Sequence, residues 1–310
     1  MYFVQIYATF SRFMHTPTLF YAMGGGLGHL QRCVALLKNG GGATQNTVVC
    51  SASPHLPTFA QQHSLRYYAI PTIWATEPAA LTLFLTNLLQ KEQLTTIYID
   101  VFPLGIIGEW NEILPKFPML NLVYIARRMK WELYAPLIKY SPQFNCTLVV
   151  EDLQPDHWEF VRQSSQQIIE QKITAATPQT STSCPIQEDF YLVLHSEPAE
   201  EIAVLLHYAY DKQQLSKDNV VFVVVSQIKP TSIVKELNRY LLDTKITYLK
   251  TFDTDSLVKK AKKIFTACGF NTMHYLQNYS HKHYYIPFER KYDDQFWRSK
   301  NSNSPYILEI

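Results

Sequence analysis

The sequence predicts an α/β protein of two Rossmann-like domains, each a doubly wound parallel sheet, that face each other across a cleft. Short apolar runs alternate with stretches of helical periodicity along most of the chain, which is the pattern of strands joined by crossover helices. A polar stretch divides this alternation into two sets. The length of 310 residues fits two domains of roughly 150 residues each. Ligands of such sheets bind at the carboxyl ends of the strands, so we expect a site in the cleft.

Composition narrows the class of protein. Hydrophobic residues make up 47% of the chain and charged residues 17%, which excludes disordered, collagen-like and coiled-coil proteins. The net charge of +2 predicts no nucleic-acid partner. The chain shows neither the roughly 20-residue apolar run of a spanning helix nor a signal-peptide pattern. Its five cysteines are scattered and form no CxxC pair, so we expect reduced thiols in a cytoplasmic protein.

The N-terminal domain is expected over residues 1–173. Strands are predicted where apolar residues run together between turn-forming residues, and helices where apolar residues recur with helical spacing. The expected strands are Thr18–Met23, Thr47–Ser51, Arg66–Ile70, Thr96–Val101, Leu120–Ile125 and Cys146–Glu151, and the expected helices are Leu30–Lys38, His55–His63 and Pro78–Lys91.

Residues 174–189 are expected to form a linker, because Thr, Ser, Pro and Gln bury too little apolar surface to order a core element. The C-terminal domain is expected over residues 190–298. A tail follows at 299–310, where Pro and Ser argue against a long helix. The expected strands are Phe190–His195, Val220–Ser226, Ile246–Leu249, Lys263–Ala267 and Tyr284–Pro287, and the expected helices are Ala199–Tyr210, Thr231–Leu242, Asp255–Ala261 and Phe270–Gln277.

A glycine-rich turn, Gly24 to Gly28, lies between the first predicted strand and the first helix. Glycine lets the backbone approach a ligand closely, and a helix start offers unpaired N–H groups to an anion. The spacing is not GxGxxG, and no acidic residue ends the second strand, so a nicotinamide cofactor is disfavoured. His29 has the side chain best suited to proton transfer near neutral pH, and Arg32 could support an anion. Helix capping and an exposed arginine are the structural alternatives.

Two later segments also place polar groups at predicted strand ends. Thr266 to His274 contains a small-residue turn and a helix start, where Asn271 and Thr272 could either cap the helix or bind a phosphate. Ile286 to Gln295 is a strand end followed by charged residues. Its Asp and Gln side chains could bind sugar hydroxyls, and a solvated surface loop is the alternative.

Together these segments resemble the MurG-like branch of the GT-B glycosyltransferases, including its uncharacterised bacterial members. Gly24 to His29 is similar to the family's GGxxGH loop, Thr266 to His274 to its second glycine turn, and Ile286 to Gln295 to its Asp-Gln element. Asp100 to Gly105 with Glu109 also looks like a family segment, as does Ala126 to Arg128. The resemblance covers about residues 18 to 298 and implies the GT-B fold with a shortened C-terminus.

The resemblance implies a transferase that takes a sugar from a nucleotide diphosphate. His29 would be the catalytic residue and would face the reaction centre. Phe252 would lie near the base, the second glycine turn would hold the diphosphate, and the Asp-Gln element would bind the sugar. The implied donor-binding residues are Gly25, Gly26, Gly28, Phe252, Gly269, Asn271, Thr272, Glu289, Arg290, Asp294 and Gln295.

The same resemblance implies an inverting reaction that needs no metal and no cofactor, because helix N-termini would stabilise the charge that develops on the leaving diphosphate. Asp253 and Asp255 form a DxD pattern ahead of a predicted helix, where capping explains them better than a metal does. Tyr275 takes the place of the Glu with which the family binds the ribose.

The leading functional hypothesis is therefore a glycosyltransferase that uses a UDP-sugar donor and an acceptor that the sequence does not identify. One alternative is a nucleotide-sugar hydrolase in which His29, within the Gly28-His29-x-x-Arg32 pattern, activates water. The other is a GT-B binding protein that has lost catalysis. Aromatic residues of the N-terminal domain, such as Tyr67, Tyr68 and Trp74, could contact a sugar, a membrane surface or a partner protein, although such residues more often pack in the core.

Overall fold

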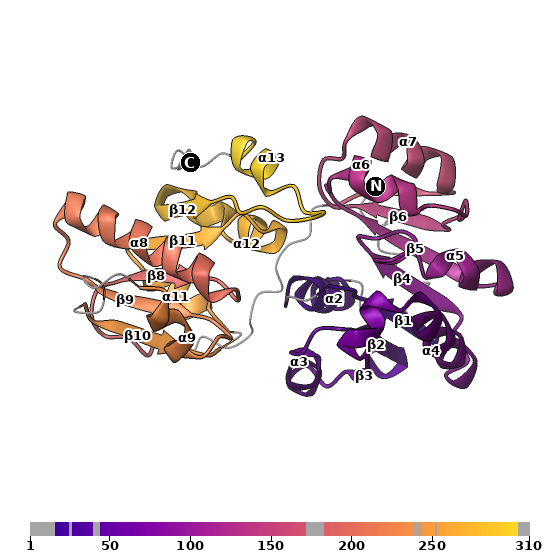
Figure 1. Ribbon diagram of the computed structural model, residues 1–310, viewed down its shortest axis with the longest axis horizontal. Helices are drawn as coiled ribbons and strands as arrows, with labels where there is room; N and C mark the ends of the chain where they lie inside the picture. The colour runs from indigo at the N-terminus through magenta and orange to yellow at the C-terminus, as the bar shows by residue number, and fades with distance from the viewer. Residues whose placement is uncertain are drawn as a thin grey trace. The chain divides into compact units, whose positions relative to one another are not determined.

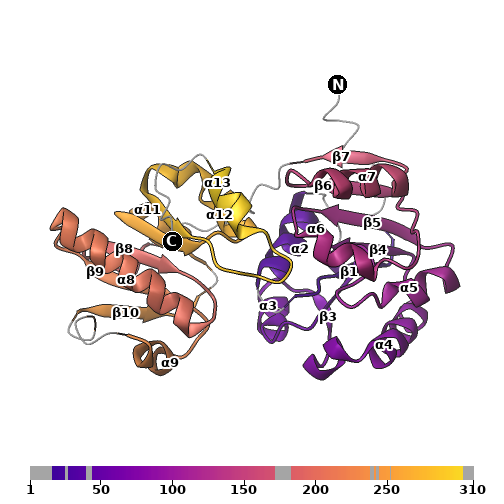
Figure 2. The same cartoon turned by 45° about the horizontal axis from the view of Figure 1, so that its top comes forward.

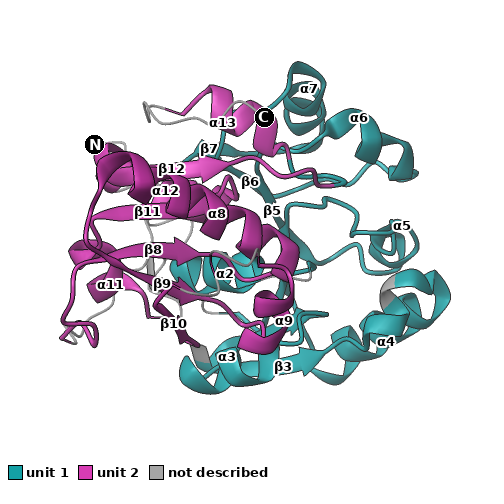
Figure 3. Cartoon of the chain, turned by 60° about the vertical axis from the view of Figure 1, so that its left-hand side comes forward, with its two compact units in different colours: residues 1–176, 291–293 teal, residues 177–290, 294–310 magenta. Residues whose placement is uncertain are grey.

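A computed structural model describes residues 16–24, 27–39, 44–171, 183–237, 241, 244–251 and 253–302. The chain divides into two compact units, coloured separately in Figure 3. Unit 1 comprises residues 1–176 together with Lys291–Asp293, and unit 2 comprises residues 177–290 and 294–310. A short C-terminal segment therefore belongs to the N-terminal unit.

Unit 1 is built on a seven-stranded parallel sheet with the order β3-β2-β1-β4-β5-β6-β7. Figure 1 labels β1 to β6, and Figure 2 labels β7 at the edge of the sheet. Strand β1 lies between β2 and β4, with Thr18 opposite both Thr47 and Thr96. The strands are β1 (Thr18–Tyr21), β2 (Thr47–Ser51), β3 (Arg66–Ala69), β4 (Thr96–Asp100), β5 (Asn121–Ala126), β6 (Cys146–Val149) and β7 (Ile168–Glu170). The helices are α2 (Leu27–Asn39), α3 (Leu56–Gln62), α4 (Pro78–Lys91), α5 (Trp110–Ile113), α6 (Trp131–Tyr134) and α7 (Pro155–Ser164).

Unit 2 is built on a five-stranded parallel sheet with the order β10-β9-β8-β11-β12 (Figure 1). The strands are β8 (Phe190–Leu194), β9 (Val221–Val225), β10 (Ile246–Leu249), β11 (Lys263–Ala267) and β12 (His283–Ile286). The helices are α8 (Ala199–Ser216), α9 (Pro230–Lys235), α11 (Asp255–Lys260), α12 (Phe270–Tyr275) and α13 (Gln295–Lys300).

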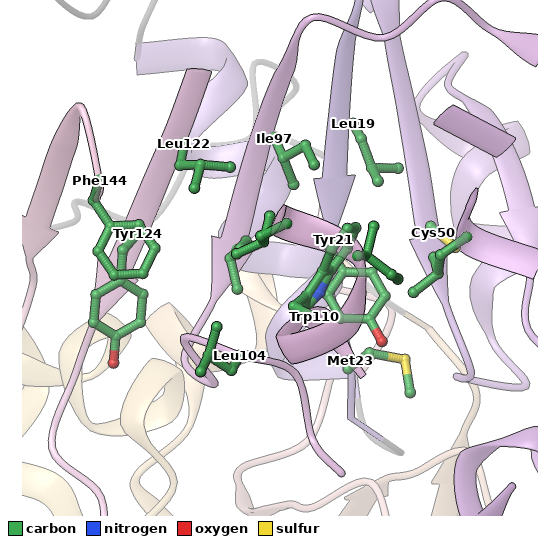
Figure 4. Close-up of a cluster of buried hydrophobic side chains, with 14 of the residues drawn as sticks. Leu19, Tyr21, Met23, Cys50, Ile97, Leu104, Trp110, Leu122, Tyr124 and Phe144 are labelled. Atoms are coloured by element: carbon green, nitrogen blue, oxygen red, sulfur yellow. The ribbon is translucent and has the colours of Figure 1, made fainter. Parts of the chain in front are cut away.

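The core of each unit is formed by its own central strands. In unit 1, Leu19 and Tyr21 of β1 and Ile97 of β4 pack with Trp110, which enters from α5 (Figure 4). In unit 2, β8, β9 and β11 contribute buried apolar side chains to both faces of the sheet. Strands covered on both faces read as continuous apolar runs, which is why the sequence predicted the two parallel sheets, and the structure confirms them.

Several elements differ from the expectation. Helix α2 begins at Leu27, earlier than predicted, and α8 continues to Ser216. The helix expected over Thr231–Leu242 corresponds to α9, which ends at Lys235. The sequence did not predict the short elements of unit 1 or the helix α13. Helix α7 was also missed, although its apolar residues Trp158, Phe160 and Val161 pack on the core of unit 1.

Candidate functional site

His29 and Arg32 lie one turn apart on α2, which follows β1 directly, and both reach Asp100 at the end of the neighbouring strand β4. The His29 Nδ1 atom lies 2.6 Å from Asp100 Oδ2. Arg32 donates from Nε to Asp100 Oδ1 at 2.6 Å and from Nη2 to Oδ2 at 2.9 Å. The fold thus joins three polar side chains where β1 and β4 end, which is where parallel α/β sheets bind ligands.

The charges of this cluster depend both on its burial and on its ion pairs. Burial alone would raise the pKa of Asp100, but Arg32 and His29 outweigh it and hold that pKa below its usual value. Burial lowers the pKa of His29, and the nearby cations Arg32 and Arg127 lower it further, against the opposing effect of Asp100. An ionised carboxylate only accepts hydrogen bonds. Near neutral pH, His29 is therefore a neutral imidazole that donates from Nδ1 and keeps a lone pair on Nε2.

The imidazole of His29 is held between backbone and an aromatic ring. A Cβ atom on Gly24 would overlap the Cδ2 and Nε2 atoms of His29, so only glycine fits at this position. On another side the ring of Phe102 lies 6.2 Å from the imidazole, centroid to centroid, with 19° between the planes. The His29 side chain nevertheless stays 14% exposed. Gly28 lies on α2, whereas Gly25 and Gly26 are outside the described residues.

The loop after β4, which carries Phe102, is fixed by the buried carboxylate of Glu109. Glu109 accepts hydrogen bonds from the Tyr21 hydroxyl and from the backbone N–H groups of Ile106, at 3.2 Å, and Ile107, at 3.0 Å. Gly105 has φ +87°, and a Cβ there would overlap the Glu109 carboxylate. Burial raises the pKa of Glu109. Because Glu109 is buried and bonds to neighbouring parts of the chain, we infer that its role is to hold this loop in its conformation.

The segment Lys291–Asp293 packs on unit 1 close to this loop. Asp293 forms an ion pair with Arg127, and the backbone N–H of Lys130 donates to the carbonyl of Tyr292 at 2.7 Å. The Tyr292 ring lies edge-on to Phe102 with centroids 5.4 Å apart. The predicted Asp-Gln element therefore contributes residues to both units.

In unit 2, the predicted diphosphate turn follows β11. Gly269 precedes α12, and a Cβ atom there would have only Thr272 Oγ1 near it among the described residues, at 3.9 Å, so this part of the chain leaves open space beside Gly269. Asn271 and Thr272 are half-buried on α12. Arg298 of α13 donates from Nη1 to the carbonyl of Cys268 at 2.7 Å. This bond joins the turn to the C-terminal helix that begins at Gln295.

The predicted sugar-binding residues make contacts within unit 2. Arg290 donates to both carboxylate oxygens of Glu201 at 2.6 and 2.5 Å, and His195 Nε2 lies 2.8 Å from the same carboxylate. Asp294 caps α13 by accepting from the Trp297 backbone N–H at 3.1 Å.

The other two residues between Ile286 and Gln295 that were predicted to bind the donor, Gln295 and Glu289, differ in exposure. The Oε1 atom of buried Gln295 accepts from the Phe288 N–H at 3.0 Å. Glu289 is exposed. Phe252 lies outside the described residues. Arg290, Asp294 and Gln295 therefore stabilise the loop that surrounds them.

The DxD pattern is tied to α11. Asp253 Oδ1 accepts from the backbone N–H of Asp255 at 3.3 Å, and Asp255 accepts from the hydroxyl of Tyr275. Tyr275 is therefore paired with a carboxylate. Within the described part of the chain, no three His, Cys, Asp or Glu residues gather as metal ligands.

Sequence reasoning missed Asp100, Glu201, His195 and Arg298 as members of these clusters. Asp100 had a usable signal, since it is an acidic residue at the carboxyl end of a predicted strand beside the one that leads into the glycine turn. The partners of Arg290 and Arg298 gave no comparable signal, because each contact joins segments far apart in sequence.

Among the helices that the structure describes, none combines the length and the apolar character that a membrane-spanning helix needs.

Comparisons with known proteins rest on structure. No family model and no curated protein match the sequence. MnaA of S. aureus, in a structure with UDP, is 9% identical, with a TM-score of 0.60 over 89% of this chain and 80% of that one. The spinosyn rhamnosyltransferase SpnG is 11% identical, with a TM-score of 0.57 over 94% and 86%. MurG of Acinetobacter baumannii is 12% identical, with a TM-score of 0.50 over 91% and 81%.

These likenesses extend over about nine-tenths of the chain and include MurG itself, which agrees with the resemblance seen in the glycine turns and the Asp-Gln element. At 9 to 12% identity they establish architecture rather than activity. The two parallel α/β units, with their strand orders, give this protein the GT-B fold on which MurG is also built.

Proposed function

We propose that the protein transfers a sugar from a nucleotide diphosphate, a UDP-sugar, to an acceptor hydroxyl. The observation that carries the proposal is the pair formed by His29 and Asp100, a neutral imidazole whose Nδ1 lies 2.6 Å from a buried, ionised carboxylate. Proteins that share the fold include one solved with UDP, which supports the choice of nucleotide, and one named as a rhamnosyltransferase, which supports sugar transfer.

In this mechanism His29 is the general base. Its Nε2 lone pair takes the proton of the acceptor hydroxyl while the hydroxyl oxygen attacks the anomeric carbon from the face opposite the diphosphate. The bond from that carbon to the diphosphate oxygen breaks, and its electron pair leaves with UDP, so the configuration inverts. Asp100 accepts the Nδ1 hydrogen bond and stabilises the imidazolium that forms. Arg32 keeps Asp100 ionised.

Unit 2 would bind the donor. In this proposal Gly269, Asn271 and Thr272 contact the diphosphate, since Gly269 leaves the turn open and the two polar residues are half-buried beside it. The bond from Arg298 to the Cys268 carbonyl keeps the turn in place. Asp294 and Gln295 act less directly, by holding the charged loop before α13.

We further propose that transfer needs neither a metal nor a cofactor. The carboxylates of the DxD pattern are already engaged, because Asp253 accepts from the chain at Asp255 and Asp255 binds Tyr275. Release of UDP is then expected to be the same with EDTA and with added Mg²⁺. A rate that disappears with EDTA and returns with Mg²⁺ would contradict this part of the proposal.

Donor binding can be tested by thermal unfolding. A ligand that binds only the native state at 100 times its Kd stabilises it by about 2.7 kcal/mol. We expect millimolar UDP and at least one UDP-sugar to raise the Tm, and ADP-sugars at the same concentration to raise it less. No shift with UDP or with any common UDP-sugar would overturn the proposal.

The same pair favours one competing function, hydrolysis of the nucleotide sugar, because a base on Nε2 can activate water as well as a hydroxyl. Incubation of the protein with a UDP-sugar and no acceptor distinguishes the two. A hydrolase releases free sugar and UDP in equal amounts at its full rate. A transferase releases them slowly and accelerates when its acceptor is added.

A further inference from the structure

Val101, the residue between Asp100 and Phe102, has an unusual backbone conformation. Its φ is +68°, in the left-handed region that β-branched residues rarely occupy. The N–H of Phe102 donates to the carbonyl of Asp100 at 2.8 Å, so the three residues form a γ-turn, whose form with positive φ is strained. The side chain of Val101 is fully buried.

This turn places the two residues on either side of Val101 against the same imidazole. Asp100 binds Nδ1 of His29 at 2.6 Å, and the ring of Phe102 stacks on His29 with centroids 6.2 Å apart. Strained backbone persists only where its surroundings hold it, and such strain concentrates at functional sites. The conformation of Val101 thus decides the geometry on two sides of His29.

Strand β5 holds Val101 in place through two contacts. The Val101 N–H donates to the carbonyl of Ile125 at 3.0 Å, and the hydroxyl of Tyr124 donates to the Val101 carbonyl at 2.9 Å. A phenol has one proton to give. The second contact of the Tyr124 hydroxyl, with His157 Nε2 at 2.9 Å, must therefore be a bond that His157 donates.

Burying the polar imidazole of His157 is less favourable in free energy than burying an apolar ring at the same place. Its Nδ1 is buried with no hydrogen-bond partner in the described part of the chain, and burial lowers its pKa to about 3. Its ring stacks on Trp131, with the centroids 4.0 Å apart and 6° between the planes. Phenylalanine could make the same stack without burying a ring nitrogen that lacks a hydrogen bond. What histidine adds is the bond that orients the Tyr124 hydroxyl.

We propose that Tyr124, oriented by His157, is a positioning residue that holds Val101 in the γ-turn and so keeps Asp100 and Phe102 against His29. The effect of Tyr124 on catalysis rests on the proposed function, because that effect requires His29 to be the general base. The geometric claim itself concerns the protein without ligand and can be tested in that state.

The test is Tyr124→Phe, read from the NMR signals of the His29 ring, which His29→Gln assigns by their loss. In the wild type we expect a protected Nδ1–H signal from the bond to Asp100. In Tyr124→Phe that signal should broaden or disappear, and the pKa of His29 should fall further because the raising effect of Asp100 weakens. Tyr191→Phe, which removes a part-buried phenol hydroxyl in unit 2, is the matched control and should leave both readings unchanged.

Val101→Gly tests the role of the backbone. Glycine adopts positive φ without the steric penalty, so in that background Tyr124→Phe should change the His29 signals less than it does alone. His157→Phe, which keeps the stack on Trp131, should move them in the same direction as Tyr124→Phe and serves if Tyr124→Phe fails to fold.

Once a donor is known, Tyr124→Phe should lower kcat by up to about a hundredfold with little change in KM. Wild-type His29 signals in both Tyr124→Phe and His157→Phe would overturn the inference, as would an equal Tyr124→Phe effect in the Val101→Gly background. Those results would leave the proposed function standing. Failure of every UDP-sugar to bind would overturn the function and leave this geometry untouched.

Discussion

Arg32 donates two hydrogen bonds to Asp100, one to each carboxylate oxygen, at 2.6 and 2.9 Å. Both side chains are almost fully buried, so each charge depends on the other for compensation. Such a pair fixes direction as well as charge, because the planar guanidinium matches the carboxylate. The oxygen that also receives the His29 hydrogen bond therefore has one defined position, which is what a general base requires of its partner.

Arg32→Gln should destabilise unit 1. Removing one partner leaves the other charge buried and unpaired, which typically costs about 3–5 kcal/mol. Unfolding in urea at pH 7, followed for wild type and variant, measures this cost. Arg66→Gln is a suitable control, because the Arg66–Glu92 pair is largely exposed on the arginine side. A change below about 1 kcal/mol for Arg32→Gln, the size expected of an exposed pair, would contradict this account.

Gly24→Ala and Gly269→Ala should behave differently. A Cβ atom on Gly24 overlaps the His29 imidazole, so Gly24→Ala should displace His29 and lower the Tm. In the part of the chain that the structure describes, a Cβ on Gly269 meets only Thr272 Oγ1, at 3.9 Å, so Gly269→Ala should keep the wild-type Tm. If a diphosphate binds at this turn, the added methyl group should nevertheless reduce the Tm shift produced by UDP. Equal UDP shifts in Gly269→Ala and wild type would count against that binding site.

His157 should make the protein less stable in acid. Its pKa in the folded state, about 3, lies below the ordinary value. As pH falls below the ordinary value, the unfolded chain takes up a proton that the folded protein refuses, so the free energy of unfolding decreases. His157→Phe should remove about 1.4 kcal/mol per pH unit of this dependence between roughly pH 6 and pH 4. If the free energy of unfolding varied with pH in the same way for variant and wild type, His157 would not be the source of this pH dependence.

Arg127→Gln should raise the pKa of His29. Arg127 is one of the cations that lower this pKa, although it also forms an ion pair with Asp293. Titration of the His29 ring signals by NMR would show the shift directly. An unchanged or lower pKa would indicate that Arg127 does not act on the imidazole.

The sequence predicted the fold well where strands are continuous apolar runs. Thr47–Ser51 and Lys263–Ala267 are strands with the predicted bounds, because a strand buried on both faces has a clear apolar signal. Ile246–Leu249 also has its predicted bounds, although it is a half-buried strand at the edge of its sheet. Strand β4 ends at Asp100, one residue before its predicted end, because Val101 turns with φ +68°. A valine in an apolar run gives no sign of such a turn, since its propensity favours the strand.

The candidate site was predictable only in part. His29 could be singled out because it lies where a glycine turn meets a helix, a local pattern. Asp100 became its partner through the pairing of β1 with β4, which is a long-range property of the sheet. The pairing of Arg290 with Glu201 likewise joins residues that are 89 positions apart. Local patterns carry no information on such contacts.

The central claim, that His29 is the base of a sugar-transfer site, is tested most directly by the rate of UDP release from UDP-sugars by wild type and by His29→Gln. Glutamine is similar in size and cannot take a proton near neutral pH. We expect wild type to release UDP from at least one UDP-sugar. His29→Gln should keep the UDP-induced rise in Tm and lose the rate by about a hundredfold or more. Equal rates in the two proteins would contradict the claim.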